Sequence, residues 1–283
     1  MSRPGITEYL RPESLEEAWR SIADGAPTVR LLSGGSDLTI SAPPEVITLV
    51  DLSRALDSAV SATDDGSIQI GAGATLTAIL EHQPLVDHGG GVIPEMMVQV
   101  GSPLLRNSAT IGGHLARGRL SDVVPVLIAL DAEVRIHRDG GQTSMSLSRY
   151  LSEGHNTRPH ILTEVMLPAL PASSAAAFHR QARTAFDFPI LNACCRVDLG
   201  PGGVDQVRIV CGATPHLAHR AARAEASIES DGLTPSAIET ASRLAGEEVP
   251  TETGWVASAE YRSHLVEVLV ARCLTAVAER LGR

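Results

Sequence analysis

The sequence contains no lysine, and this absence limits the chemistry open to the chain. All 23 basic residues among its 283 residues are arginines. A Schiff base on lysine and a phosphate-binding loop built around a lysine are therefore excluded. The formal net charge is −10, whereas proteins that bind nucleic acids need a basic surface. We therefore expect no nucleic-acid partner.

Cysteine is scarce as well. The four cysteines are Cys194, Cys195, Cys211 and Cys273, and no two of them form a C-x-x-C pair. An iron–sulfur cluster needs about four suitably spaced cysteines, and no cluster of histidine and cysteine has the spacing of metal ligands. The sequence thus predicts no metal site on this chain. Three of the four lie in apolar, strand-like segments, where buried, unreactive thiols are expected.

Long apolar runs and a leader sequence are also missing. No stretch of about 18 apolar residues occurs, so membrane insertion is not expected. The first residues lack the composition of a signal peptide, which favours a cytoplasmic protein. A chain of 283 residues is near the upper limit for one core, and this favours two domains.

Hydrophobic periodicity predicts an α+β chain in two parts. Up to residue 167 the pattern predicts helices at 12–25, 75–82 and 122–130, and strands at 29–32, 46–52, 67–71, 132–137, 142–147 and 161–167. A hairpin turn is expected at 139–141 and a break at 89–91. After a proline-containing boundary at 168–174, three strands are expected at 176–183, 190–199 and 206–212, followed by helices near 217–230, 234–246 and 258–281. Ser258 is the predicted N-cap of the last helix.

Two glycine loops carry the strongest functional signal. One is SGGSD at residues 33–37, directly after Leu32, and the other is ATIGGH at residues 109–114. Glycine brings backbone N–H groups close to a ligand without an intervening Cβ, and successive N–H groups form a concavity that suits an anion. Two such loops could hold the two phosphates of a dinucleotide. Taken alone, each glycine pair is also compatible with an ordinary turn after a strand.

The residues around the second loop extend this signal. The second loop lies within the string GSPLLRNSATIGGH at residues 101–114, which is followed by SDVVPVLIALDA at 121–132. This pattern resembles the FAD-binding subunit of the molybdenum hydroxylases, the family of xanthine dehydrogenase and aerobic carbon monoxide dehydrogenase. Three further strings resemble the same family in the same order: LTEVMLP at 162–168, FHRQAR at 178–183 with Asp187, and SAEYR at 258–262. The resemblance therefore covers nearly the whole chain.

The resemblance implies a fold, a cofactor and a set of cofactor-binding residues. The expected fold is α+β. It comprises an FAD-binding domain of the vanillyl-alcohol oxidase type at residues 1–170, with subdomains of about 1–55 and 56–170, and a C-terminal domain at 174–283 with a three-stranded antiparallel sheet and helices. The cofactor-binding residues that match the family pattern are Leu32, Ser33, Gly34, Gly35, Ser36, Asp37, Thr110, Ile111, Gly112, Gly113, His114, Asp122, Leu162 and His179. Asp122 could alternatively cap the helix that follows it.

The sequence departs from the family pattern at several positions. His114 stands where the family has asparagine, and His179 stands where lysine is common. The segment 115–121 replaces a family stretch and is one residue shorter. Within it, Arg117 and Arg119 could add positive charge beside the pyrophosphate or could belong to a solvated loop. These departures concern contacts to the cofactor more than the fold.

Three functions remain open from the sequence. The first is an electron-transfer subunit. In this hypothesis, electrons pass from a large molybdopterin-binding subunit to a small 2Fe–2S subunit, and from there through the FAD of this chain to an external acceptor. The family suggests that the three chains form a dimer of heterotrimers. The second is a standalone FAD-dependent oxidoreductase in a biosynthetic pathway. The third is a degenerate, non-catalytic subunit. No catalytic residue is predicted, because the flavin would carry the chemistry.

Overall fold

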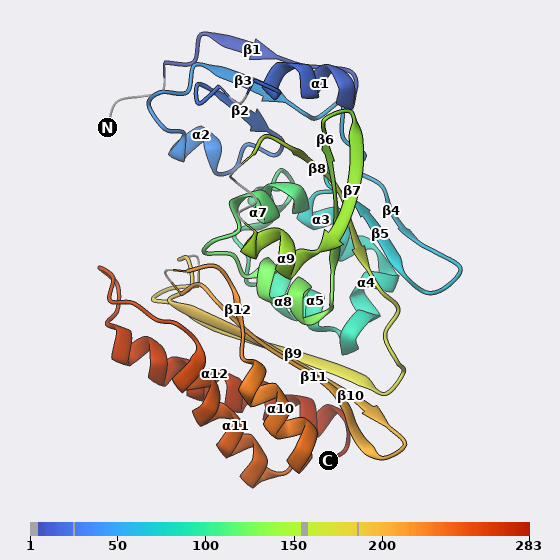
Figure 1. Cartoon of the computed structure of the whole chain (residues 1–283), viewed down its shortest axis with the longest axis vertical. Coiled ribbons are helices and arrows are strands. Elements are labelled where there is room, and N and C mark those ends of the chain that lie inside the picture. Colours follow the sequence, from blue (N-terminus) through green and yellow to red (C-terminus); the bar gives the residue numbers. More distant parts are fainter. Residues whose placement is uncertain (1–4, 25, 154–157, 186, 215) are drawn as a thin grey trace. The chain divides into compact units, whose positions relative to one another are not determined.

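Two compact units make up the chain (Figure 1). The computed structural model describes residues 5–24, 26–153, 158–185, 187–214 and 216–283. The N-terminal unit comprises Met1–Glu81, Ser102–Ala116 and Ala132–Leu167, and the C-terminal unit comprises His82–Gly101, Arg117–Asp131 and Pro168–Arg283. The chain therefore passes between the units several times. The linear division into domains at 1–170 and 174–283 stays a prediction.

The N-terminal unit begins with a small parallel sheet. Its strands are β1 (Glu8–Leu10), β2 (Val29–Leu32) and β3 (Thr48–Asp51), in the order β1-β3-β2. Helix α1 (Leu15–Ile22) joins β1 to β2 and buries Trp19 in the core of this sheet. The helix is shorter than the predicted 12–25, because Ser14 caps it: the Ser14 hydroxyl accepts a hydrogen bond from the Glu17 N–H at 3.3 Å.

A five-stranded antiparallel sheet forms the rest of the framework of the N-terminal unit. Its strands are β4 (Val60–Ala62), β5 (Ile68–Gly71), β6 (Glu133–Arg138), β7 (Gly141–Ser146) and β8 (Ile161–Leu167), in the order β4-β5-β8-β6-β7. The predicted β6–β7 hairpin is confirmed. Its two turn residues, Asp139 and Gly140, have φ of 53° and 72°, as a two-residue hairpin loop requires.

Short helices connect the strands of the N-terminal unit. They are α2 (Leu38–Ser41), α3 (Leu76–Glu81), α6 (Pro103–Arg106), α7 (Ile111–Arg117) and α9 (Leu147–Ser152). Only α3 is predicted from the sequence. Helices of one or two turns are too short to show a helical period, so hydrophobic periodicity does not predict the other four.

The C-terminal unit is built on a four-stranded antiparallel sheet in the order β12-β11-β10-β9 (Figure 1). The three long strands are β9 (Ser174–Gln181), β10 (Leu191–Gly200) and β11 (Gly203–Gly212), as predicted. The fourth, β12 (His219–Arg220), is a two-residue edge strand inside the segment where a helix was expected to begin. Because His219 and Arg220 pair with β11, helix α10 starts later, at Ala222–Asp231.

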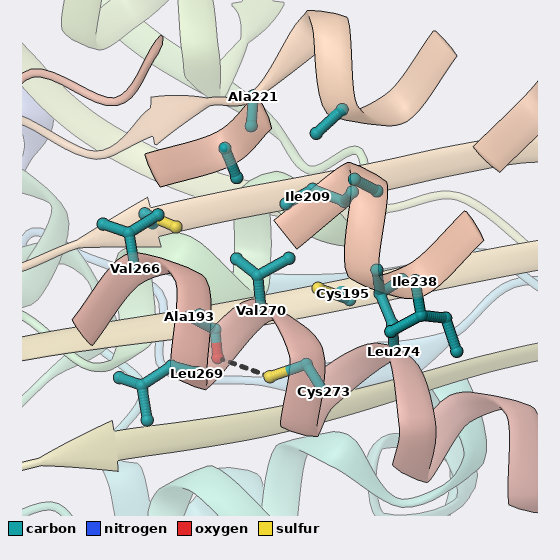
Figure 2. Close-up of a cluster of buried hydrophobic side chains, with 14 of the residues drawn as sticks. Ala193, Cys195, Ile209, Ala221, Ile238, Val266, Leu269, Val270, Cys273 and Leu274 are labelled. Carbon is teal, nitrogen blue, oxygen red and sulfur yellow. Dashed lines mark hydrogen bonds between the residues drawn. The ribbon is translucent and has the colours of Figure 1, made fainter. Parts of the chain in front are cut away.

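Three helices cover one face of this sheet: α10, α11 (Pro235–Glu248) and α12 (Ala259–Arg280). Ser258 caps α12 as predicted, since its hydroxyl accepts a hydrogen bond from the Tyr261 N–H at 3.2 Å. Figure 2 shows α12 lying against β10, with Val266, Leu269 and Val270 directed into the apolar core. The Cys273 thiol donates a hydrogen bond to the Ala193 carbonyl at 3.3 Å in the same core.

The opposite face of the C-terminal sheet is covered by chain segments that precede it in the sequence. They form α4 (Gln83–Asp87), the short η1 (His88–Gly90), α5 (Val92–Met97) and α8 (Val123–Ala129). Arg196 of β10 is 1% exposed and joins this layer to the sheet. Its guanidinium donates to the Ala129 carbonyl at 2.9 Å and to carboxylates of Asp131 at 2.8 Å and Asp198 at 3.1 Å.

Among the described residues, no helix combines the length and the hydropathy that crossing a membrane requires.

Candidate functional site

The first glycine loop connects a strand to a helix in the N-terminal unit. Strand β2 ends at Leu32 and helix α2 begins at Leu38, so residues 33–37 form the connection. Gly35 has φ of 68°, a left-handed conformation that favours glycine. The loop is closed by the Thr39 hydroxyl, which donates to the Gly35 carbonyl at 2.7 Å. The backbone N–H groups before α2 are therefore presented from a fixed turn.

The second glycine loop is folded differently from the first. Thr110 forms an isolated antiparallel bridge with Thr75, and Ile111 opens helix α7. The Gly112 N–H donates to the Ala72 carbonyl at 3.0 Å, and the Gly113 N–H donates to the Thr110 hydroxyl at 3.3 Å. The two N–H groups that the sequence suggested as anion donors are thus already bonded within the chain.

Close packing explains why glycine occupies position 112. A Cβ at Gly112 would lie 2.8 Å from the Ala72 carbonyl oxygen, a distance that real Cβ atoms do not show. Glycine at position 112 lets α7 approach the backbone that leads from β5 to α3. Contact of Gly112 and Gly113 with the cofactor remains a prediction.

The two loops meet in space although they are far apart in sequence. The Thr110 hydroxyl donates to the Ser33 hydroxyl at 3.1 Å, across 77 residues of sequence. The backbone of Gly34 lies so close to Ser108 that a Cβ on Gly34 would stand 1.9 Å from the Ser108 carbonyl oxygen. The structure therefore brings together the two motifs that the sequence singled out.

The first loop has the donor set that a pyrophosphate needs. Within the described part of the chain, no hydrogen bond takes up the backbone N–H of Gly34, Gly35 or Ser36. Consecutive N–H groups around a left-handed glycine form an anion-binding concavity. Glycine at position 34 lets the loop pack against the Ser108 carbonyl, where no side chain fits. The residues of the first loop therefore fit the phosphate groups of FAD, and contacts from the second loop remain a prediction.

Two further predicted contacts lie in the N-terminal unit. His114 is half-buried on α7, and its N–H donates to the Thr110 carbonyl at 3.2 Å. Leu162 lies on β8, 7% exposed, opposite Ile136 of β6. Both positions belong to the same unit as the two glycine loops. Their contact with the cofactor remains a prediction.

Asp122 belongs to the C-terminal unit and is engaged by two side chains. It is 6% exposed, accepts a hydrogen bond from the Asn192 amide at 2.7 Å and forms an ion pair with Arg180 at 3.2 Å. Burial raises the pKa of the Asp122 carboxyl, and Arg180 and Asn192 counteract part of that rise. A contact of Asp122 with the cofactor remains a prediction; in this structure its carboxylate joins α8 to the sheet.

Asp122 stands at the N-cap position of α8, as the alternative interpretation predicts. Its side chain makes no capping hydrogen bond to α8. The Ser121 hydroxyl does so instead, and it accepts from the N–H groups of Val123 at 3.2 Å and Val124 at 3.3 Å. The hydroxyl one residue earlier has the reach that the cap requires.

His179 and Asp122 lie on opposite faces of the C-terminal sheet. Arg180, which binds Asp122, is the next residue along β9, and successive strand residues point to opposite faces. His179 pairs with Ala193 of β10, whose carbonyl meets Cys273 of α12. Burial lowers the pKa of the His179 imidazole. The structure thus does not bring these two predicted cofactor contacts together.

Sequence reasoning missed three residues that organise these sites. The Arg180 guanidinium also donates to the Gln99 carbonyl at 2.6 Å and to the Asp187 carbonyl. Asn192 is completely buried, and a polar residue inside the apolar run at 190–195 was a usable signal. Ser108 contacts the first loop through its backbone carbonyl, and any residue type would supply that group, so the sequence could not indicate it.

Family models match the two parts of the chain. The FAD-binding domain in molybdopterin dehydrogenase matches residues 5–170, and the C-terminal domain of the carbon monoxide dehydrogenase flavoprotein matches residues 176–277. The chain belongs to the FAD-binding subunits of the molybdenum hydroxylase family. FAD is therefore the cofactor of this subunit, and the subunit is part of an FAD-dependent oxidoreductase.

Known proteins resemble this FAD-binding subunit over nearly its full length. It is 30% identical over 292 residues to the alpha subunit of the 6-hydroxypseudooxynicotine dehydrogenase complex of Paenarthrobacter nicotinovorans, covering 98% of this chain and 96% of that one. It is 25% identical over 291 residues to the xanthine dehydrogenase FAD-binding subunit of Escherichia coli O157:H7, covering 98% of each. A carbon monoxide dehydrogenase structure from Hydrogenophaga pseudoflava has the same fold, with a TM-score of 0.88 at 23% identity and 99% coverage of both chains.

Replacing Thr110 with valine tests the link between the two loops of this FAD-binding subunit. Valine keeps the shape but removes a 6%-exposed hydroxyl that joins Ser33 to the Gly113 N–H. The expected cost is about 0.5–1.5 kcal/mol of unfolding free energy, measured in urea, because the partly buried hydrogen bonds to the Ser33 hydroxyl and from the Gly113 N–H are lost. Thr77→Val is the control, since the Thr77 hydroxyl donates to the Asn107 side chain at an exposed site. Equal stability of the two variants would contradict the link.

Proposed function

We propose that this subunit carries electrons from the iron–sulfur clusters of a partner subunit, through its FAD, to an external acceptor. The single observation that carries the proposal is the first glycine loop. Within the described residues, no hydrogen bond takes up its N–H groups at Gly34, Gly35 and Ser36, and Ser33 of the loop is bonded to Thr110 of the second loop. Bound FAD supplies a ring that exchanges electrons either singly or in pairs. That ability suits a carrier between a one-electron centre and a two-electron acceptor.

The residues of the chain bind and orient the cofactor in this proposal. The N–H groups of Gly34, Gly35 and Ser36 would donate to the pyrophosphate, and no lysine is needed for that contact. The bond from Thr110 to Ser33 fixes the loop before the cofactor binds, which reduces the entropy lost on binding. The predicted contacts at Asp37, His114, Leu162, Asp122 and His179 remain part of the proposal.

The proposed partners are a molybdopterin-binding large subunit and a small 2Fe–2S subunit, in a dimer of heterotrimers. Relatives of this chain are named as a subunit of a dehydrogenase complex and as a medium subunit. The four cysteines of this chain are buried and free, and burial raises the pKa of the Cys194, Cys195 and Cys211 thiols. A metal cluster needs thiolate ligands, whereas a raised pKa keeps these buried cysteines as neutral thiols. The cysteines therefore suit a packing role. In the proposal, the metal centres are therefore on the partner chains.

Purification of the tagged chain from its own cells tests this proposal. We expect a complex that contains FAD, iron and molybdenum, with a mass that reports its stoichiometry. After selective removal of this subunit, the remaining complex should still reduce its iron–sulfur clusters with substrate but should no longer reduce the external acceptor. A chain that purifies without iron or molybdenum and turns over a small substrate alone would instead support a standalone oxidoreductase.

A further inference from the structure

A row of three residues crosses neighbouring strands of the C-terminal sheet on the face that α8 covers. Arg180 of β9 pairs with Asn192 of β10, and Asn192 pairs with Gly212 of β11. Residues that lie directly opposite each other in an antiparallel sheet point to the same face. A Cβ at Gly212 would overlap the ring of Pro125 in α8. Glycine at this position therefore lets the first turn of α8 approach the sheet beside Asn192.

This approach brings Asp122, at the N-terminal end of α8, onto the other two residues of the row. The Asn192 amide donates to Oδ1 of Asp122 at 2.7 Å, and the Arg180 guanidinium pairs with Oδ2 at 3.2 Å. Each carboxylate oxygen is thus held from a different strand. Among the described residues, these two side chains are the partners of the carboxylate. Because an ionised carboxylate has about four lone-pair positions, it can still accept a hydrogen bond from a ligand.

The Arg180 guanidinium is itself fixed before any ligand binds. Its side chain is 7% exposed, and it donates to the Gln99 carbonyl at 2.6 Å and to the Asp187 carbonyl. Gln99 follows α5, and Asp187 lies in the loop between β9 and β10. Two carbonyls from separate segments therefore orient the guanidinium towards Asp122. A charge that is oriented in advance acts on its neighbour without further rearrangement.

The burial of Asp122 makes this cation important. Burial raises the pKa of the Asp122 carboxyl, whereas Arg180 and Asn192 lower it. With Arg180 in place, the group is a carboxylate that only accepts hydrogen bonds. Without the cation, burial favours the neutral acid, whose O–H is a donor. The hydroxyl groups and the ring N–H of FAD are donors, so they match the carboxylate rather than the acid.

We propose that Arg180 is a positioning residue of the cofactor site, which holds Asp122 as a charged acceptor for a hydroxyl or N–H group of FAD. Arg180 acts through Asp122 and does not itself contact the cofactor. The basic residue that serves Asp122 is thus Arg180 rather than its neighbour His179, which lies on the other face of the sheet. The inference rests on the proposed function in taking Asp122 as a contact of the bound FAD.

Titration of the flavin-free chain with FAD, followed by flavin fluorescence, tests this role. Arg180→Met keeps the length of the side chain but removes its charge, and it should raise the dissociation constant for FAD by about tenfold. Arg180→Lys keeps the charge and should raise the constant by less than about threefold. A lysine variant that binds as weakly as the methionine variant would overturn the proposal, because the bonds to Gln99 and Asp187 would then matter and the charge would not.

A double-variant cycle shows whether Arg180 acts through Asp122. Asp122→Asn removes the carboxylate charge and should itself weaken FAD binding. Adding Arg180→Met to Asp122→Asn should then change the dissociation constant by less than about twofold, because no charge is left for the guanidinium to hold. A full tenfold loss in the Asp122→Asn background would overturn the proposal. An Asp122→Asn chain that binds FAD like the parent would also overturn it.

Arg220→Met is the matched control for a loss of stability. Arg220 pairs with Glu225, whose side chain is 6% exposed, so this variant also takes the arginine from a buried acid of the C-terminal unit. It should lower the melting temperature but leave the dissociation constant for FAD within about twofold of the parent. A tenfold rise here would overturn the proposal. Failure of the partner's clusters to reduce the bound FAD would defeat the proposed function alone, since these titrations involve no electron transfer.

Discussion

Replacing Gly34 with alanine should reduce the flavin bound per chain to less than about a tenth of the parent value. The added Cβ would stand 1.9 Å from the Ser108 carbonyl oxygen and 2.8 Å from its carbonyl carbon. Backbone atoms on both sides prevent a small local adjustment, so the first loop must move away from the second. That movement displaces the N–H groups that are proposed to hold the pyrophosphate, and a loss of about 1.4 kcal/mol already lowers affinity tenfold. Flavin absorbance per protein after gel filtration measures the effect.

Two controls separate cofactor loss from general unfolding. Gly141→Ala lies in the same unit, and its added Cβ would meet only the Arg138 carbonyl oxygen at 3.9 Å, an ordinary contact. This variant should retain flavin like the parent. Far-ultraviolet circular dichroism of Gly34→Ala should show the secondary structure of the parent, because the loop lies outside the strands and helices. A Gly34→Ala protein that retains full flavin would contradict the assignment of this loop.

The sequence predicts the elements whose signals are local. Strands β2 and β8 have the predicted bounds, because each is an apolar run bordered by turn residues. The cap at Ser258 and the turn at Asp139 and Gly140 also follow from residue types at fixed offsets. The two glycine loops were found in the same way, and the family resemblance explains why they occur together.

The parts that the sequence could not predict depend on tertiary contacts. The clash at Gly34 involves a backbone carbonyl at Ser108, and the clash at Gly112 involves Ala72; neither partner has a distinctive side chain. The edge strand β12 is two residues long and exists because β11 offers it hydrogen bonds. Asn192, which donates a hydrogen bond to the Asp122 carboxylate, lies 70 residues away in the sequence. Periodicity and local spacing carry no information on such pairs.

Replacing Arg196 with methionine is expected to give the largest loss of stability in the C-terminal unit. Methionine fills part of the volume but removes every hydrogen bond that the guanidinium makes to Ala129, Asp131, Asp198 and Gln206. Asp198, whose side chain is 5% exposed, is then left with a buried charge and no paired arginine among the described residues. Breaking a buried pair on one side costs about 3–5 kcal/mol, which lowers the melting temperature by about 10 °C for a unit of this size.

The same variant tests how the segment after the second glycine loop is anchored. Asp131 ends α8 in a left-handed conformation with φ of 53°, and its carboxylate bridges Arg196 and Arg208, the latter at 2.8 Å. Arg196 thus ties residues 117–131 to the sheet through a carboxylate and through the Ala129 carbonyl. Loss of that tie should expose the segment to a protease earlier than the helices α10 to α12, and limited proteolysis with mass identification measures this order.

A charge-matched pair of variants decides whether buried charge is the cause. Arg243→Met removes an exposed arginine from its ion pair with Glu247, and it should change the unfolding free energy by less than about 1 kcal/mol. Adding Asp198→Asn to Arg196→Met removes the uncompensated charge, so the double variant should be less destabilised than the sum of the two single changes. Strict additivity would show that the lost packing of the arginine side chain, rather than the stranded carboxylate, determines the stability of this layer.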